Sequence, residues 1–405
     1  MVAISIKNVD VIFGSKTQQT LALLDQGKTR QQIINTTGDT VGVHNASIDI
    51  KEGEICVLMG LSGSGKSSLL RAINGLNKTS RGQLLVRDGD NMVDVASCDS
   101  STLLHLRSHK ISMVFQNFAL MPWLSVLDNV AFGLEMQGIT KQQRHQKAMQ
   151  QLKMVGLDEW ADKRPNQLSG GMQQRVGLAR AFTMDTDILL MDEPFSALDP
   201  LIRNQLQDEL IELQQKLKKT IVFVSHDLDE ALKIGSKIGI MESAQIIQYD
   251  IPENIVLNPA NAYVQDFVAH TNPLNVLKAH SLMTPLSALV NTANNAQQST
   301  VIIDQQQQIE LTIDRQQQLL HVTLGGQVLG LQFCTGEQDI QQLSTSSITI
   351  IASDTSMRRA IEIKHHTGLP IILAEREKVL GMLNDKSFYH ALLGKHFQTD
   401  FSEAS

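Results

Sequence analysis

Residues 60–67 read Gly-Leu-Ser-Gly-Ser-Gly-Lys-Ser, and this stretch decides the fold class of the chain. It matches the pattern G-x-x-x-x-G-K-[ST] of a phosphate-binding loop, and it lies between the apolar run Ile55–Met59 and a helical pattern, as such a loop requires. Glycines let backbone N–H groups turn inward around phosphate oxygens, and the N-terminus of the next helix adds partial positive charge. We expect nucleotide contacts from Gly60, Ser62, Gly63, Ser64, Gly65, Lys66, Ser67 and Ser68.

Short apolar runs alternate with helical patterns over residues 1 to about 270. Besides Ile55–Met59, the runs Ile188–Met191 and Thr220–Val224 have the length and composition of buried parallel strands. The expected helices are Ser67–Asn74, Lys141–Val155, Gly171–Phe182 and Pro200–Leu217. This alternation predicts an α/β domain around the phosphate-binding loop.

The composition of the chain excludes several classes of protein. At 405 residues, two or three domains of roughly 150 residues each are expected. The net charge of −7 does not favour a nucleic acid partner, and no apolar run is long enough to cross a membrane. The N-terminus lacks the pattern of a signal peptide. Three scattered cysteines exclude a disulfide framework and fit a reducing cytosol.

Polar residues lie at the carboxyl ends of two of the strand-like runs. Asp192 ends one of them, where a carboxylate can hold Mg²⁺ together with the Ser67 hydroxyl, while Lys66 places its charge on the β- and γ-phosphates. The adjacent Glu193 can orient and polarise an attacking water. His226 ends another run and is a candidate for contact with the γ-phosphate. The structural alternatives are a charged strand end and an ordinary histidine.

A second anion site is expected at Ser169, Gly170 and Gly171, which open a predicted helix. One nucleotide has a single triphosphate, so a second anion site on the same chain requires an explanation.

Gln116, the stretch Leu168–Met172, the turn Ser196–Asp199 and His226 occur with the loop in an order that resembles the ATP-binding subunits of ABC transporters. The resemblance covers residues 1 to about 270. It implies a P-loop ABC-type ATPase domain that uses ATP and Mg²⁺. In that family two copies pair head-to-tail, and each ATP lies between the phosphate loop of one copy and the signature helix of the other.

This pairing explains the second anion site, because Ser169 would face the nucleotide of the other copy. The resemblance implies further that Asp199 lies at the dimer seam, that Phe13 stacks on adenine, and that Gln116 joins Ser67 and Asp192 around Mg²⁺. The alternative for Phe13 is a core side chain. Met172 departs from the family, which usually has Gln at the fifth signature position.

The resemblance also implies a helical subdomain at about 117–165 that docks a separate transmembrane permease. The apolar stretch Leu120–Leu124 is the candidate docking surface, and internal packing of its side chains is the alternative. The other implied partners are an extracellular or periplasmic substrate-binding protein and a second copy of the chain. The expected location is the cytoplasmic face of the cell membrane.

An insert between Phe13 and Gly60 resembles the branch of the family that imports quaternary amines. Within it, Thr29 and Gln32 have the spacing of a helix capping box. The stretches Arg87–Val95 and Phe267–Leu277 look more like choline-specific members, so choline is the expected solute. Glycine betaine or proline betaine is the alternative.

The composition changes after about residue 271, where Gln, Ser, Thr and Asn become frequent. We expect the ATPase domain at 1–270, a linker at 271–278 and a smaller α+β regulatory region at 279–405. Residues 348–393 resemble one cystathionine β-synthase (CBS)-type motif, although Ser387 replaces the usual Asp. The alternative is a small regulatory domain made of strands only.

Two other functions were weighed against import. Soluble ABC ATPases of DNA repair carry a long coiled coil, and ribosomal ones usually carry two ATPase modules; neither pattern occurs in this sequence. A regulatory protein that binds ATP without turnover is disfavoured by the intact Glu193 and His226.

Overall fold

The structure is a computed structural model. It describes residues 1–116, 118–196, 198–269, 271–272, 274, 276–289, 291–294, 298–304, 308–335, 339–376 and 378–393. Contacts divide the chain into two units, Met1–Ile255 and Val256–Ser405. No helix in the described ranges is long and apolar enough to cross a membrane. Ala197, in the predicted turn, lies outside the described residues.

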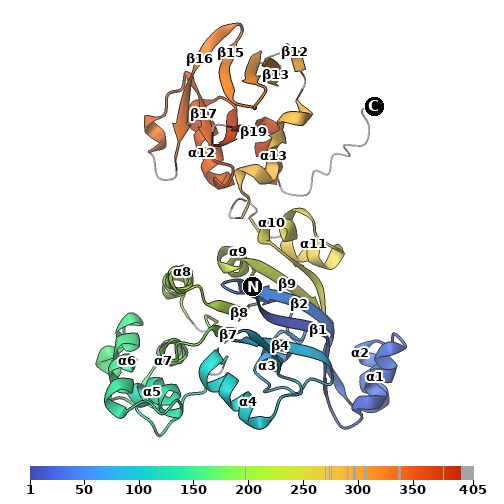
Figure 1. Cartoon of the computed structure of the whole chain (residues 1–405), viewed down its shortest axis with the longest axis vertical. Coiled ribbons are helices and arrows are strands. Elements are labelled where there is room, and N and C mark those ends of the chain that lie inside the picture. Colours follow the sequence, from blue (N-terminus) through green and yellow to red (C-terminus); the bar gives the residue numbers. More distant parts are fainter. Residues whose placement is uncertain are drawn as a thin grey trace. The chain divides into compact units, whose positions relative to one another are not determined.

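A six-stranded sheet forms the centre of the first unit, in the order β10-β9-β3-β8-β7-β6 (Figure 1). Strands β3, β6, β7 and β8 are parallel to their neighbours, and β3 and β8 are buried along their whole length, which explains their continuous apolar sequence. Because these strands are parallel, their carboxyl ends meet at one edge. The strands are β3 Ile55–Met59, β6 Ile111–Val114, β7 Ile188–Asp192, β8 Thr220–Val224, β9 Lys237–Glu242 and β10 Gln245–Asp250.

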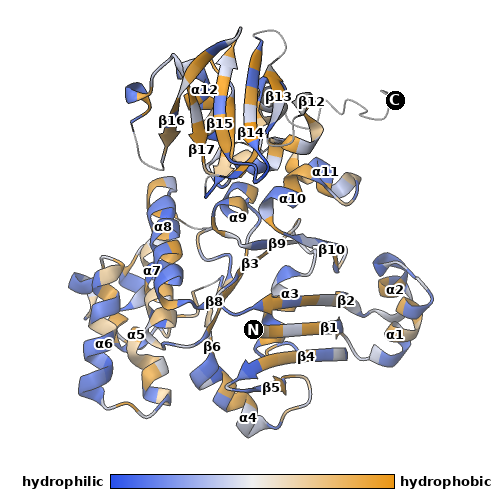
Figure 2. Ribbon diagram, turned by 45° about the horizontal axis from the view of Figure 1, so that its top comes forward, coloured by the Kyte–Doolittle hydropathy of each residue, from blue (hydrophilic) through white to orange (hydrophobic). Residues whose placement is uncertain are grey.

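A second sheet of four antiparallel strands belongs to the same unit. Strands β2, β1 and β4 run side by side in it (Figure 2). One hydrophobic cluster combines side chains of this sheet, of the six-stranded sheet and of helix α3, so the two sheets share a core. The elements are β1 Val2–Phe13, β2 Thr40–Lys51, α3 Lys66–Ile73, β4 Arg81–Asp88 and β5 Asn91–Asp94.

Helices α5, α6 and α7 pack together, and α7 also contacts strand β6 of the six-stranded sheet (Figure 1). They have an apolar cluster of their own, against which Leu120 and Met172 pack. Trp123 is 70% exposed, whereas Leu120 and Leu124 at the two ends of the same stretch are partly buried. Besides α3, the α-helices described in this unit outside the insert are α4 Ser100–His105, α5 Val126–Met136, α6 Lys141–Met154, α7 Gly170–Thr183, α8 Pro200–Leu217, α9 Leu228–Ile234 and α10 Pro252–Leu257, the last of which includes the boundary between the two units.

The insert folds as two helices, α1 Thr17–Asp25 and α2 Arg30–Thr37. The predicted capping box is confirmed, since Thr29 and Gln32 each accept a backbone N–H of the other at the start of α2. A small apolar cluster anchors the insert, and Ile33 in that cluster is fully buried.

The second unit is built on a nine-stranded sheet with α12 Met357–Thr367 and α13 Asp385–Leu393. Separate hydrophobic clusters cover it, and one of them contains side chains of both helices. Strand-only content is therefore wrong for this region. The other elements are α11 Ala262–Val268, β11 Thr284–Pro285, β12 Asn291–Asn294, β13 Gln298–Asp304, β14 Ile309–Asp314, β15 Leu319–Leu324, β16 Gln327–Cys334, β17 Ser347–Ile351, β18 Ile371–Glu375 and β19 Lys378–Leu383.

The buried carboxylate of Asp39 ties both ends of the insert together. It is 2% exposed and accepts hydrogen bonds from the backbone N–H of Lys16 at 3.1 Å and the hydroxyl of Thr20 at 2.9 Å. We predict that Asp39→Ala lowers the free energy of unfolding by about 2 kcal/mol, because buried donors lose their acceptor. Urea denaturation measures the change, with exposed Asp90→Ala as the matched control. An unchanged midpoint would contradict the anchoring role.

Candidate functional site

The predicted phosphate loop connects β3 to α3 and has a backbone that requires glycine. Gly60, Gly63 and Gly65 have φ values of 142°, 76° and 105°. A Cβ atom at Gly60 would lie 2.1 Å from the carbonyl oxygen of Met241, and one at Gly65 would lie 2.2 Å from that of Gly42. The loop therefore depends on glycine both for its conformation and for its close packing.

The side chain of Lys66 lies across its own loop. Its Nζ donates to the carbonyl oxygens of Gly60 at 2.8 Å and Leu61 at 3.1 Å. Burial lowers the pKa of the Lys66 ammonium, while Glu193 and Asp192 act in the opposite direction. The residue is 6% exposed, so it holds a largely desolvated cation beside the loop, where it can attract an anion.

Asp192 joins the phosphate loop to the end of β7. The Ser67 hydroxyl donates to its Oδ1 at 2.7 Å, and Nη2 of Arg71 donates to its Oδ2 at 2.9 Å. Asp192 is completely buried. The structure thus brings together Ser67 and Asp192, as the sequence predicted. A hydroxyl and a carboxylate are hard oxygen donors of the kind that Mg²⁺ accepts.

Gln116, Glu193 and His226 converge at the carboxyl edge of the parallel strands. Nε2 of Gln116 donates to the Glu193 carboxylate at 3.2 Å, and Nδ1 of His226 lies 3.4 Å from the same oxygen. The three residues follow β6, β7 and β8. The backbone of Glu193 is left-handed, with φ 48°, and such strain concentrates at functional positions.

Three further predicted contact residues lie in or near the loop, namely Phe13, Ser64 and Ser68. A Cβ atom at Gly42 would come within 2.5 Å of the Phe13 ring and 3.1 Å of the Ser68 hydroxyl. Phe13 and Ser68 therefore both lie close to the backbone of Gly42. Phe13 is 41% exposed at the end of β1, which leaves ring surface open to a partner. The Ser64 hydroxyl is buried and has no hydrogen-bond partner among the described residues.

Ser169 and Asp199 lie at the beginnings of two helices. The Ser169 hydroxyl accepts from the N–H of Met172 at 3.3 Å, and Asp199 accepts from that of Ile202 at 3.0 Å. These two side chains therefore cap their own helices. A Cβ at Gly170 would meet nothing within 4 Å, so this helix start is open.

Sequence reasoning missed Arg71 and the buried carboxylate of Glu230. Arg71 stands four positions after Ser67 on α3, a spacing that places both on one helix face. Glu230 accepts from Nε2 of Gln207 at 3.0 Å and from the Ser225 hydroxyl. Burial raises the pKa of Glu230, and these two hydrogen bonds oppose it. It therefore connects α8 and α9 to the segment that carries His226.

A mostly apolar cavity of about 400 Å³ lies in the first unit, between β6 and the helices around it. Its lining includes exposed large hydrophobic side chains of α4 and α5, Leu104 at 66% and Met136 at 62%. Met121, from the apolar stretch predicted as a docking surface, also lines it.

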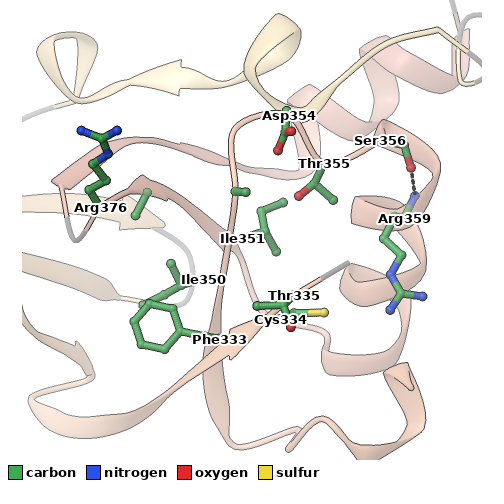
Figure 3. A pocket seen from close by; sticks show the side chains of 12 residues that line it. Phe333, Cys334, Thr335, Ile350, Ile351, Asp354, Thr355, Ser356, Arg359 and Arg376 are labelled. Carbon is green, nitrogen blue, oxygen red and sulfur yellow. Dashed lines mark hydrogen bonds between the residues drawn. The ribbon is translucent and has the colours of Figure 1, made fainter. Parts of the chain in front are cut away.

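A second cavity of about 520 Å³ lies in the second unit, beyond the carboxyl ends of β16, β17 and β18 (Figure 3). Two arginines, Arg359 and Arg376, line it together with Asp354 and the exposed ring of Phe333. The backbone N–H of Arg359 donates to the Ser356 hydroxyl at the start of α12. The cavity thus combines charged and aromatic groups.

Comparison with known proteins gives a consistent result for the first unit. The family model described as ABC transporter matches residues 43–196. The chain is 40% identical over 408 residues to the "Glycine betaine transport ATP-binding protein OpuAA" of Bacillus subtilis, covering 98% of this chain and 93% of that protein. It is 50% identical over 281 residues to the "Glycine betaine/proline betaine transport system ATP-binding protein ProV" of Escherichia coli, covering 69% of each.

Similarity extends to a further transport protein and to a solved structure. The "Trimethylamine N-oxide transport system ATP-binding protein TmoW" of Pelagibacter ubique is 46% identical over 280 residues, which cover 69% of this chain and 81% of that protein. A dimeric structure of the ATP-binding cassette MJ0796 bound to ADP and Pi has a TM-score of 0.53 at 31% identity, covering 62% of this chain and 98% of that one.

The position of the Lys66 ammonium leads to a prediction on turnover. We predict that Lys66→Ala lowers the rate of ATP hydrolysis by at least about a hundredfold, because a preorganised charge on the phosphates is lost. A phosphate-release assay measures the rate, and exposed Lys78→Ala is the control with the same loss of charge. Near-wild-type turnover of Lys66→Ala would reject its assigned role.

Proposed function

The chain belongs to the family of ATP-binding subunits of ABC transporters, and from this premise we propose that it powers the import of a quaternary amine through a separate membrane subunit. It is an ATPase of the P-loop ABC fold. The observation that carries the mechanism is the convergence of Gln116, Glu193 and His226 on the edge that also holds Lys66.

Each group at this edge has a distinct part in hydrolysis. Lys66 binds the β- and γ-phosphates and balances the charge that develops as the γ-phosphoryl leaves. Glu193 orients the attacking water and accepts a hydrogen bond from it, with Gln116 fixing the carboxylate. His226 lies against the same carboxylate and is 63% exposed, so its ring can contact the γ-phosphate.

Ser67 and Asp192 would hold Mg²⁺, with Gln116 as a further oxygen ligand. The fit rests on their chemistry and on the 2.7 Å hydrogen bond that already places a hydroxyl oxygen beside a carboxylate oxygen. No cluster of three or more His, Cys, Asp or Glu ligands occurs in the described ranges, so phosphate oxygens and water would complete the coordination. The ion would neutralise phosphate charge.

A second copy of the chain would complete the nucleotide site. Ser169, Gly170 and Gly171 form an open helix start, and a helix N-terminus favours an anion such as the nucleotide phosphate of the other copy. Asp199 would lie at the seam between the copies. Solved dimers of a related cassette support this arrangement. ATP would close the dimer and hydrolysis would release it, which makes the interface a two-state element.

The apolar cavity of about 400 Å³ supports docking of a membrane subunit on the first unit. Leu104 and Met136 line it and expose large hydrophobic surface, as expected of a docking site, and Trp123 is exposed in the same apolar stretch as Met121 of its lining. Through this contact the chain would sit on the cytoplasmic face of the cell membrane. A substrate-binding protein on the other side would deliver the solute.

We propose glycine betaine as the first solute to test, because two relatives bear that name and align with 69% or more of this chain. Choline, predicted from the stretches at 87–95 and 267–277, shares the trimethylammonium group and stays a prediction. This chain does not contact the solute in such a system, so its own residues carry no direct recognition.

The second unit would regulate the ATPase, as predicted for residues 279–405. Its mixed sheet with α12 and α13 is compatible with the proposed CBS-like character of 348–393. The domain boundaries, the linker at 271–278 and the helical subdomain at 117–165 also remain proposals.

The shared site gives a prediction on assembly. We predict that Glu193→Gln binds ATP, stays dimeric and loses turnover, because the water is no longer polarised while every phosphate contact remains. Size-exclusion chromatography with ATP reports the dimer, and exposed Glu159→Gln is the control. Elution of the ATP-bound variant as a monomer would reject the shared site.

The import role is tested by reconstituting the chain with its membrane partner. We predict ATP-dependent uptake of labelled glycine betaine that disappears with Lys66→Ala. Uptake of choline alone would support the narrower prediction made from the sequence. Active ATP hydrolysis without uptake of glycine betaine, choline or proline would show that the assigned cargo is wrong.

A further inference from the structure

The side chain of Arg30 on α2 connects the insert to the phosphate loop. Its Nη1 donates to the carbonyl oxygen of Gly63 at 2.9 Å. Gly63 lies at the exposed apex of the loop, and its φ of 76° places it in the left-handed region. The nucleotide contacts described above do not include Arg30, and sequence reasoning gave the insert no part in the chemistry.

The insert is built to hold Arg30 in place. Arg30 is the first residue of α2 and lies between Thr29 and Gln32, the two residues of the capping box that fixes the start of this helix. Fully buried Ile33 anchors the same helix one turn later. At the end of the insert the chain enters β2, where Gly42 packs its carbonyl oxygen against Gly65. The guanidinium therefore reaches the loop from a rigid support.

The bond to Gly63 has a geometric consequence for the next residue. A trans peptide is planar, and its C=O and N–H point in opposite directions. A guanidinium that holds the Gly63 carbonyl outward therefore turns the N–H of Ser64 toward the inside of the loop. In the structure this N–H donates to the carbonyl oxygen of Leu61 at 3.2 Å, within the loop. Inward N–H groups are what cradle a phosphate.

Glycine on one side of this peptide makes the restraint necessary. Gly63 has no Cβ, and a Cβ built there would meet nothing within 4 Å, so no side chain at this position restricts its backbone dihedrals. The bond from Arg30 to the carbonyl oxygen and the bond from the Ser64 N–H to Leu61 together restrain this peptide.

We propose that Arg30 is a positioning residue for the phosphate loop, which it holds in its nucleotide-binding conformation through the Gly63–Ser64 peptide. The proposal rests on the proposed function, since it assigns this loop to ATP. It gives the insert a role in binding the phosphates that ATP and ADP share.

The test compares nucleotide affinities of the full-length protein by isothermal titration calorimetry, with ADP and with a non-hydrolysable ATP analogue. Arg30→Met keeps the alkyl chain and removes the donors, and we expect both dissociation constants to rise by roughly threefold to tenfold, the effect of one charged hydrogen bond at a partly exposed site. Arg30→Lys should recover part of the loss. Lys28→Ala, an exposed residue of the same insert, controls for the loss of charge.

Steady-state kinetics add a second readout. The KM for ATP should rise in Arg30→Met with a smaller change in kcat, because the reacting groups at Glu193 are untouched. Unchanged affinities for both nucleotides would overturn the proposal. So would a loss confined to the ATP analogue, which would indicate direct contact with the γ-phosphate, or an equal loss in Lys28→Ala. If Lys66→Ala also leaves nucleotide binding and turnover intact, the proposed function fails instead.

Discussion

The buried carboxylate of Asp192 is the constraint on which the rest of the site depends. A fully enclosed negative charge is costly unless its oxygens are satisfied, and here Ser67 satisfies one and Arg71 the other. Both partners lie on α3, so the carboxylate fixes the helix that follows the phosphate loop against the end of β7. The loop and the strand edge thereby become one rigid assembly.

The parallel sheet explains why the side chains at the strand edge meet. Each of β6, β7 and β8 ends at the same edge and delivers one residue there, so Gln116, Glu193 and His226 gather although long stretches of sequence separate them. Glu230 on α9 accepts hydrogen bonds from Gln207 on α8 and from Ser225, and so connects both helices to the segment before His226. The side chains of Ser169 and Asp199, by contrast, cap the helices that they begin.

Features with a local sequence pattern could be predicted, and features made by distant side chains could not. The phosphate loop, the buried strands and the capping box at Thr29 each depend on neighbours in sequence, and the structure contains all of them. Arg71 and Arg30 donate hydrogen bonds to residues that are distant in sequence, Asp192 and Gly63. No local sequence pattern marks an arginine that makes such a contact. The nine-stranded sheet of the second unit pairs short strands, among them β11 and β19, which are far apart in sequence. Its Gln-rich sequence shows only a weak alternation of apolar and polar residues.

The two ends of the insert lie side by side. Phe13, the last residue of β1, pairs directly with Thr40, the first residue of β2. Everything from residue 14 to residue 39 therefore leaves the sheet and returns at neighbouring positions of one antiparallel ladder, where paired Cα atoms are only about 5 Å apart. A short hairpin turn would close the same gap. In evolutionary terms the insert is an elaborated hairpin that a simpler ancestor could acquire, lengthen or lose without disturbing the ladder, and it offers a natural position for grafting a reporter onto the enzyme.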